Sequence, residues 1–545
     1  MVSGQPGVPT LVAQFYFLKT RFKYFVYILP KPLHLYKSIK INRAMKRLTI
    51  EQHALQEQLR LQTRRLFLKE CAYGLGASAI GSLMGGCYNN STSPSVNTPL
   101  NAFDAANPLA PKIPHFAPKA KSVIYLHMAG APSQLELFDF KPELAKMDGQ
   151  DCPQSFLEGK KFAFIRGVPK MMGAQAQFKQ RGQSAAWISD NLPHLATIAD
   201  EITFLKGMTT DQFNHAPAQL LMHTGGARLG RPSMGSWVTY GLGSENSNLP
   251  GFVVLTSGGR DPDSGKSIWG SGFLPSVYQG VQCRSEGEPV LFIKDPHGMD
   301  RDVRRASIDA INEVNQESYK EFQDPEILSR IAQYEMAYRM QISVPDVMDI
   351  NEEPAYIHEM YGTKPGKTAF ANNVLLARKL VEKGVRFVQL FDWGWDAHGT
   401  DANLAIDYGF INKCREVDKP VAALILDLKQ RGLLDETLVI WGGEFGRTPM
   451  MENRNGVKMP FKGRDHHTDA FTIWMAGGGI KKGFTYGETD EIGYNVIKGK
   501  ATPHDVQATI LNQLGFDHEK FTYQFQGRPF RLTDVAGNVI RDVIA

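Results

Sequence analysis

The chain has 545 residues, with 61 Lys or Arg, 56 Asp or Glu and a formal net charge of +5. The basic excess is N-terminal: residues 1–86 contain 13 basic and 3 acidic residues, which leaves 48 basic and 53 acidic residues beyond them. A body with more acidic than basic residues offers no charge argument for nucleic-acid binding, so we expect no nucleic-acid partner.

The N-terminal 87 residues divide into two segments. Residues 1–44 are aromatic and basic without the layout of an export signal, and Met45 begins a more natural start, so we interpret 1–44 as a non-native or disordered extension. Residues 45–87 contain the twin-arginine pattern TRRLFLK at 63–69, followed by an uncharged stretch from Cys71 to Gly86. A basic region before a short, weakly apolar stretch is typical of an export signal. The alternative is a buried core helix of a cytosolic protein.

The signal ends at Cys87, where the sequence LMGGC resembles a lipobox. Residues 88–116 form a linker whose Ser, Asn and Pro content suits a tether leaving a membrane. One acyl chain gives only marginal anchoring, and whether Cys87 is lipidated stays open. We expect a partner in the twin-arginine export machinery, a possible membrane tether through Cys87, and a location in the periplasm or at the cell surface.

The five cysteines do not form a recognisable framework. They are scattered and contain no CxxC pair, which excludes a disulfide scaffold and a zinc ribbon. One disulfide is possible but cannot be assigned. The positions are Cys71, Cys87, Cys152, Cys283 and Cys414.

Residues 117–545 are predicted to form one large α/β domain. Short apolar runs predict buried strands, and helical patterns alternate with them. This order predicts a mostly parallel central sheet with helices on both faces. Polar residues follow several strands at the edge where ligands bind in open α/β sheets. The strands are 122–128, 252–255, 385–391, 437–441 and 471–475, and the helices are 369–383, 413–433 and 505–514.

Two segments offer metal ligands. Asp396 and His398 lie two residues apart after a strand, and a carboxylate and an imidazole so placed can share a divalent metal. The segment 463–469 reads GRDHHTD, and because adjacent histidines often point to opposite sides, we choose His466 over His467 as a ligand. A polar loop is the alternative for the first segment, and a structural role without a metal is the alternative for the second.

Two further segments offer anion-binding or catalytic groups. Glu444 and Arg447 follow two glycines: Glu444 can be a ligand, and Arg447 can pair with an anion, unless both only close a tight turn. A helix over 216–223 would place Asn214 or His215 at its N-terminus, which favours anions. His215 can then act as acid, base or nucleophile, or simply be a buried histidine beside a helix cap.

Together these segments resemble the DUF1501 family, which is related to the sulfatases within the alkaline phosphatase superfamily. The resemblance extends from about residue 117 to 543, and its motifs are specific only in combination. It implies an alkaline phosphatase/sulfatase-like fold, one or two metal ions at the strand ends, and hydrolysis of phosphate or sulfate esters. The residues that carry it are 130–134, 138–139, 214–225, 395–399, 444–448 and 465–466.

The resemblance also exposes departures. Glu444-Phe445 stands where sulfatases carry an Asp-His metal pair, and His466 or His467 falls where a later metal-binding His is expected. The strand ending at Met128 lacks the usual Asp, for which Asp139 can substitute unless the second metal is absent.

A last departure concerns the nucleophile. His215 replaces the Cys or Ser nucleophile and Gln219 the following Arg, which excludes a formylglycine mechanism. Either His215 or a metal-activated water would then attack.

The leading hypothesis is an exported metal-dependent hydrolase of phosphate or sulfate esters, acting on a small-molecule or glycan ester. Its cofactor would be a divalent metal, Zn, Mn or Ca. The rival is a non-catalytic exported protein of the same fold that binds a glycan or a surface-complex partner. A weaker alternative is an isomerase or transferase of the superfamily. The predicted residues are His215 and Arg447 for catalysis, Ser133 and Asn214 for substrate, and Asp396, His398, Glu444, His466 and Asp139 for metal.

Overall fold

The computed structural model describes residues 107–284, 290, 295, 298–454 and 456–545. The predicted extension 1–44, the export signal 45–87 with Cys71 and Cys87, and the linker up to residue 106 lie outside the described residues. All described residues belong to one compact unit. Within these ranges, no helix has the length and apolar character needed to cross a membrane.

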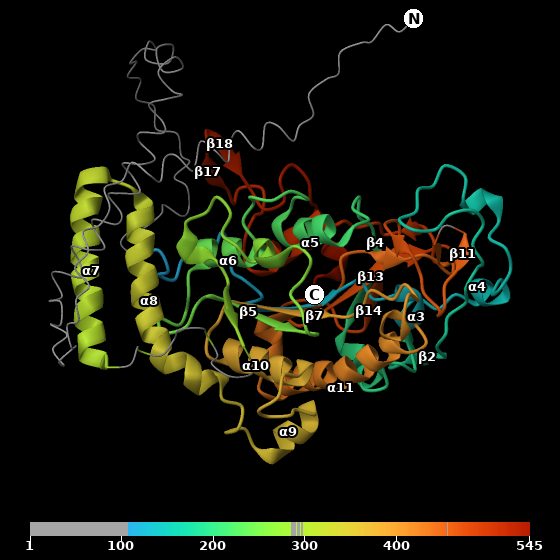
Figure 1. Cartoon of the computed structure of the whole chain (residues 1–545), viewed down its shortest axis with the longest axis horizontal. Helices are drawn as coiled ribbons and strands as arrows, with labels where there is room; N and C mark the ends of the chain where they lie inside the picture. Colours follow the sequence, from blue (N-terminus) through green and yellow to red (C-terminus); the bar gives the residue numbers. More distant parts are fainter. Residues whose placement is uncertain (1–106, 285–289, 291–294, 296–297, 455) are drawn as a thin grey trace, which may run out of the picture. The chain divides into compact units, whose positions relative to one another are not determined.

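The core of this unit is an eight-stranded sheet, which lies between two layers of helices in Figure 1. Its strands pair in parallel except for β13, which runs antiparallel to both of its neighbours. The prediction of an α/β fold with a mostly parallel sheet is confirmed, and β13 makes the sheet mixed. In sheet order the strands are β14 (Phe484–Tyr486), β4 (Thr203–Met208), β13 (Phe471–Ala476), β8 (Thr437–Gly442), β1 (Ser122–Ala129), β7 (Phe387–Trp393), β5 (Phe252–Ser257) and β6 (Val281–Cys283).

The direction of β13 follows from the connection before it. After β8 ends, residues 443–470 contain only two-residue strands and no helix, so no crossover carries the chain to the opposite edge. The chain therefore re-enters the sheet at the edge it left, which makes β13 antiparallel to β8. As a consequence, the residues just before β13 lie at the same edge as the residues just after β8.

Helices cover both faces of the sheet. Along β1, Ile124, Leu126 and Met128 pack into one hydrophobic core, while Val123 and Tyr125 pack into the other. Figure 1 shows α5 and α6 on one side of the strands and α10 and α11 on the other. These helices are α5 (His215–Thr224), α6 (Met234–Leu242), α10 (Phe370–Glu382) and α11 (Gly409–Gln430), with α12 (Pro503–Gln513) beside α5.

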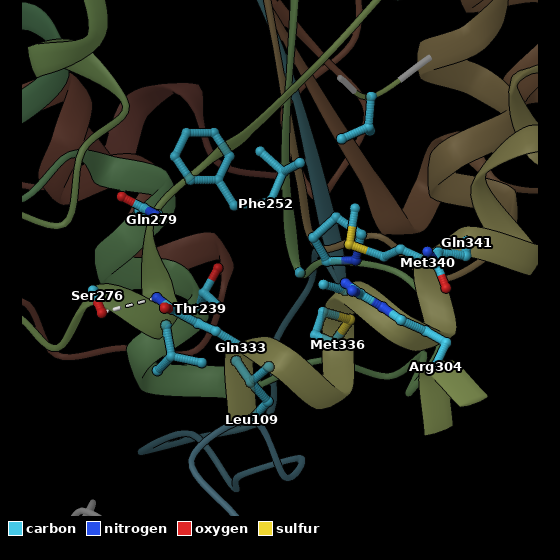
Figure 2. A pocket seen from close by; sticks show the side chains of 16 residues that line it. Leu109, Thr239, Phe252, Ser276, Gln279, Arg304, Gln333, Met336, Met340 and Gln341 are labelled. Atoms are coloured by element: carbon cyan, nitrogen blue, oxygen red, sulfur yellow. Dashed lines mark hydrogen bonds between the residues drawn. The ribbon is translucent and has the colours of Figure 1, made fainter. Parts of the chain in front are cut away.

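Two long helices that the apolar pattern did not reveal, α7 (Arg301–Phe322) and α8 (Pro325–Met348), pack against each other. A cavity of about 330 Å³ lies where α8 meets β5 and α6. Figure 2 shows its largely apolar lining, including Phe252, Met336 and Met340, with the Arg304 side chain extending into it.

The remaining elements are short and lie in the connections. The helices are α3 (Gln134–Leu137), α4 (Pro142–Lys146) and α9 (Ala355–Tyr361). The strands form five pairs: β2 (Phe178–Arg181) with β3 (Ala186–Ser189), β9 (Gly446–Arg447) with β12 (His466–His467), β10 (Asn453–Arg454) with β11 (Val457–Lys458), β15 (Glu488–Thr489) with β16 (Val496–Lys498), and β17 (Tyr523–Phe525) with β18 (Arg528–Phe530).

The three cysteines within the described ranges are free and buried. Burial raises the pKa of the Cys152 thiol to about 11 and that of Cys283 to about 12, and it raises the pKa of Cys414 well above its usual range. No disulfide joins these three residues, so they contribute to the core as small apolar side chains.

Candidate metal centre

Four ligating side chains meet at the sheet edge where β4, β7 and β8 end. Asp396 and His398 follow β7, and His215 is the first residue of α5, which follows β4. His466 lies in β12, just before β13. Because β13 is antiparallel, its beginning lies at the same edge as the ends of its neighbours. Four residues from three distant parts of the chain are thereby brought together.

The four side chains converge on one carboxylate oxygen. Asp396 Oδ1 lies 2.8 Å from His398 Nε2, 3.2 Å from His215 Nε2 and 3.4 Å from His466 Nε2. One ligand atom from each residue lies within 4.8 Å of all the others. The side chains of His215 and Asp396 keep 13% and 17% exposure, whereas His398 and His466 are buried. Among these four described residues, His215 and Asp396 are therefore the ones that a ligand from solvent can reach.

Each histidine is oriented through its other ring nitrogen. His215 Nδ1 bonds Glu444 Oε1 at 2.7 Å, His398 Nδ1 bonds Glu452 Oε2, and His466 Nδ1 lies 2.6 Å from the carbonyl oxygen of Phe213. A carbonyl oxygen only accepts, so Nδ1 of His466 carries the hydrogen, and in the neutral ring Nε2 has a lone pair. Carboxylate or carbonyl partners of this kind are typical of metal-binding histidines.

The residues fit a divalent cation. The Nε2 atoms of His398 and His466 lie 3.0 Å apart, and with hydrogens on both Nδ1 atoms their lone pairs face each other. Such an arrangement is unfavourable unless a cation or a proton lies between them. Three imidazole nitrogens and one carboxylate oxygen are ligands that suit zinc.

The charges of the cluster favour an ionised carboxylate. Burial alone would raise the pKa of Asp396, but the Arg447 guanidinium and the three histidines hold it well below its usual range. Burial lowers the pKa of His466 to about 4, against the opposing effect of Asp396. Burial also opposes protonation of His215, yet its bonds to Asp396 and Glu444 raise its pKa to about 9. Without a metal, a proton on His215 therefore balances part of the negative charge, and metal binding would release it.

Glu444 supports His215 from behind and is not one of the four converging residues. Its carboxylate is fully buried, and Oε1 accepts hydrogen bonds from Gly130 N at 3.1 Å and Gln219 Nε2 at 3.0 Å as well as from His215. Burial would raise the pKa of Glu444, but His127 and His215 keep it well below its usual range. The structure thus places this predicted ligand in an orienting position.

Arg447 differs from its predicted role because it does not face a substrate anion. Its side chain is 1% exposed. Nε donates to the Ala131 carbonyl and Nη1 to the Arg464 carbonyl, each at 3.0 Å, while Nη2 bonds both the Gly130 carbonyl and Asp396 Oδ1. The guanidinium is occupied by the protein itself, and it orients the Asp396 carboxylate.

The other predicted site residues lie apart from the cluster or at its border. Asp139 accepts a hydrogen bond from Thr489 and pairs with Lys141 at 3.3 Å, so it does not supply a ligand here. Ser133 is buried at the start of α3. Asn214 is exposed at the N-cap of α5, directly beside His215.

Two acidic residues near His398 were not predicted as partners. Asp465 accepts from the backbone N–H groups of Phe164, Ile165 and His466. Glu452 bonds His398 and Arg454. Both carboxylates already accept hydrogen bonds from the protein. The second group of ligating residues, His398, Glu452 and Asp465, therefore holds the first cluster in place and is not a separate metal site.

His467 points away from the cluster. Its Nε2 lies 2.5 Å from the Tyr494 carbonyl, and its ring stacks on that of Tyr494. His466 and His467 form the two-residue strand β12, in which successive side chains point to opposite faces.

Comparison with known proteins identifies the family. The profile described as "Protein of unknown function (DUF1501)" matches residues 120–544. The chain belongs to the DUF1501 family. No curated protein sequence matches this DUF1501 chain significantly.

Among solved structures, the DUF1501 chain is similar to three hydrolases. PsFucS1 sulfatase from Pseudoalteromonas sp. has 13% identity and a TM-score of 0.33, with 73% of this chain and 68% of that chain covered. Alkaline phosphatase from the Antarctic bacterium TAB5 has 13% identity and a TM-score of 0.28, covering 66% and 92%. Phosphonate monoester hydrolase of Agrobacterium radiobacter has 11% identity and a TM-score of 0.30, covering 73% and 74%.

Proposed function

We propose that this DUF1501 protein is an exported, metal-dependent hydrolase of phosphate or sulfate esters. One observation carries the proposal: three histidine Nε2 atoms converge on Asp396 Oδ1, and each Nδ1 is held by an acceptor. This arrangement suits metal binding better than a structural ion-pair network, because the Nε2 lone pairs of His398 and His466 face each other.

His215, Asp396, His398 and His466 would hold the metal, with zinc favoured over Mn and Ca by the three nitrogen ligands. When bound, the metal would supply Lewis-acid polarisation of the ester oxygen. Glu444 and Glu452 fix the ring orientations of His215 and His398. In this proposal His215 is a ligand and not the nucleophile, because its Nε2 faces Asp396.

A second candidate function is a non-catalytic binding protein with a structural metal. The observation that favours it is the number of ligands. Four protein ligands complete a tetrahedral zinc site, and closed sites of this kind are structural, whereas catalytic sites keep one position open. Only turnover distinguishes the two candidates.

Metal analysis and turnover by the same purified protein test both candidates. We expect about one zinc per chain in the wild type and a loss of zinc in His398→Ala and His466→Ala. His467→Ala is the matched control, because this neighbour faces Tyr494. Zinc with hydrolysis of an aryl phosphate or aryl sulfate supports the hydrolase, and zinc without turnover supports the binding protein. A protein that binds no divalent metal would refute both.

Export and tethering are tested separately in cells. Replacement of Arg64 and Arg65 by lysine should retain the protein in the cytoplasm if the twin-arginine machinery exports it. Replacement of Cys87 by alanine should release the exported protein from the membrane fraction if this residue is lipidated. Unchanged fractionation in either variant contradicts the corresponding proposal.

A further inference from the structure

The burial of Arg447 leaves the recognition of a substrate anion to other residues. Two further arginines lie near the histidine cluster, Arg260 on the His215 side and Arg454 on the side of His398 and His466. Both are partly exposed, and both stack on an aromatic ring that contacts a cluster histidine. We call Arg260, Trp393, Phe164 and Arg454 the arginine rim.

On one side, Arg260 lies over Trp393, with its guanidinium carbon 3.6 Å from the ring centroid. The Trp393 ring lies 6.2 Å from that of His215 between centroids. Arg260 follows β5 and Trp393 ends β7, so neighbouring strands of the sheet bring them to this edge. The Arg260 side chain is 52% exposed and pairs through Nη2 with Asp263.

On the other side, Arg454 lies over Phe164, 4.1 Å from the ring centroid. Phe164 contacts both His398 and His466, with centroid distances of 5.0 Å and 5.6 Å. Arg454 is 37% exposed and uses Nε to bond Glu452 Oε1. Stacking on an aromatic face holds a guanidinium flat and leaves its edge available for hydrogen bonds with sulfate or phosphate oxygens.

We propose that Arg260 and Arg454 bind anionic groups of the substrate on the two sides of the metal centre, and that the substrate is a polymer bearing repeated sulfate or phosphate groups. This inference rests on the proposed function, because the rim is assigned to the substrate of that site. Two cations that flank one reacting position suit a ligand whose charged groups continue beyond the cleaved one. The exposed side chain of Phe213, beside the cluster, adds an apolar surface for the polymer backbone.

The net charge of the chain implies that a polyanion would bind at the arginine rim and not over the whole surface. The chain after residue 86 has more acidic than basic residues, so the body as a whole repels a polyanion. Binding of an anionic polymer therefore needs a local cationic site.

The experiment measures binding of the full chain, zinc-loaded and zinc-free, to dextran sulfate and polyphosphate, with neutral dextran as the uncharged probe. Arg260→Gln and Arg454→Gln should each weaken binding of at least one polyanion about 5-fold, because each removes one charge-assisted contact. The matched control is Arg528→Gln: Arg528 is also 52% exposed, stacks on Phe530 and pairs with Asp534. This control should bind as the wild type does.

Three results overturn the rim assignment: no polyanion binding by the wild type, equal weakening by Arg528→Gln, or no weakening by the two rim variants. If dextran sulfate binds more tightly, the substrate is a sulfated polymer, and if polyphosphate binds more tightly, it is a phosphorylated one. Binding by zinc-free protein that depends on Arg260 and Arg454, without any ester turnover, supports the rim while the hydrolase proposal fails. Turnover of aryl esters together with wild-type polyanion binding by both variants supports the hydrolase proposal, while the rim assignment fails.

Discussion

Replacing His215 with asparagine removes the ring nitrogen that faces Asp396 and keeps a donor close to Glu444. In the wild type Nδ1 of His215 bonds Glu444 Oε1 at 2.7 Å, and Nε2 lies 3.2 Å from Asp396 Oδ1. The Nδ2 atom of asparagine takes a position similar to that of imidazole Nδ1. The variant therefore separates a ligand role from a structural role of the same residue.

The expected loss of metal affinity is large. Removing only the outer partner of a metal-binding histidine costs about 10- to 100-fold in affinity. Removing one of the four ligands should exceed that range, so we expect zinc affinity to fall more than about 100-fold, or about 2.7 kcal/mol. Because Glu444 keeps a donor here and its bonds to Gly130 and Gln219, the zinc-free protein should lose less than about 1.5 kcal/mol of stability.

Competition with a zinc chelator measures the affinity, and denaturant unfolding of the zinc-free protein measures the stability. His215→Ala is the comparison, because it also removes the donor to the buried Glu444 carboxylate and should cost about 3 kcal/mol of stability. If His215→Asn binds zinc as tightly as the wild type and loses only turnover, His215 is not a ligand. The nucleophile or general-acid role suggested by its sequence position would then be correct.

Two substitutions test the surroundings of the cluster, and thiol labelling tests the burial of the cysteines. Glu452→Gln should weaken zinc binding about 10- to 100-fold, because it alters the acceptor that orients His398; an unchanged affinity in chelator competition contradicts this. Gly130→Ala should lower zinc affinity and should lower the free energy of unfolding by more than about 2 kcal/mol. Gly130 has φ +105°, and an added Cβ would lie 2.6 Å from Asp396 N. A wild-type denaturation curve would contradict this and show that the backbone relaxes. In native protein the thiols within the described ranges should not react with a thiol reagent at pH 8, but all should react in denaturant, since burial raises the pKa of Cys152, Cys283 and Cys414.

Much of the sheet could be predicted because its central strands are apolar on both faces. The run SVIYLHM at 122–128 forms β1, which is buried throughout. The missed strand β4 contains Lys206 and Gly207 within TFLKGM, which interrupts an apolar run of that kind. The edge strands β6 and β14 have only three residues each. A segment that short has no periodicity from which to predict a strand.

The long helices α7 and α8 were missed for a different reason. Residues of α7 are mostly charged or polar, and only Ile308, Asn312 and Asn315 are buried along its 22 residues. A helix that buries so few apolar residues contains no continuous apolar run from which to predict it. Its position depends on contacts with α8, which one local segment of sequence cannot show.

The residues of the cluster could be predicted from local spacing, but the groups that orient them could not. Asp396, His398 and His466 lie in short segments dense in ligating groups, next to predicted strands. The Phe213 carbonyl that orients His466 is a backbone group with no sequence signal. The burial of Arg447 also depends on carbonyl groups from residues 130, 131 and 464, which only the folded chain brings together.

Three residues that depart from the sulfatase-like pattern, His215, Gln219 and Phe445, lie together in the folded chain. His215 and Gln219, one helical turn apart on α5, both donate to Oε1 of Glu444. Phe445, which stands where the pattern has a histidine, places its ring 4.9 Å from that of His215 and 4.5 Å from that of His466.

Because Glu444 is fully buried, replacing His215 or Gln219 alone with a residue that cannot donate would remove a hydrogen bond from its carboxylate. We therefore expect His215, Gln219 and Phe445 to act together in positioning the Glu444 carboxylate and the His215 ring.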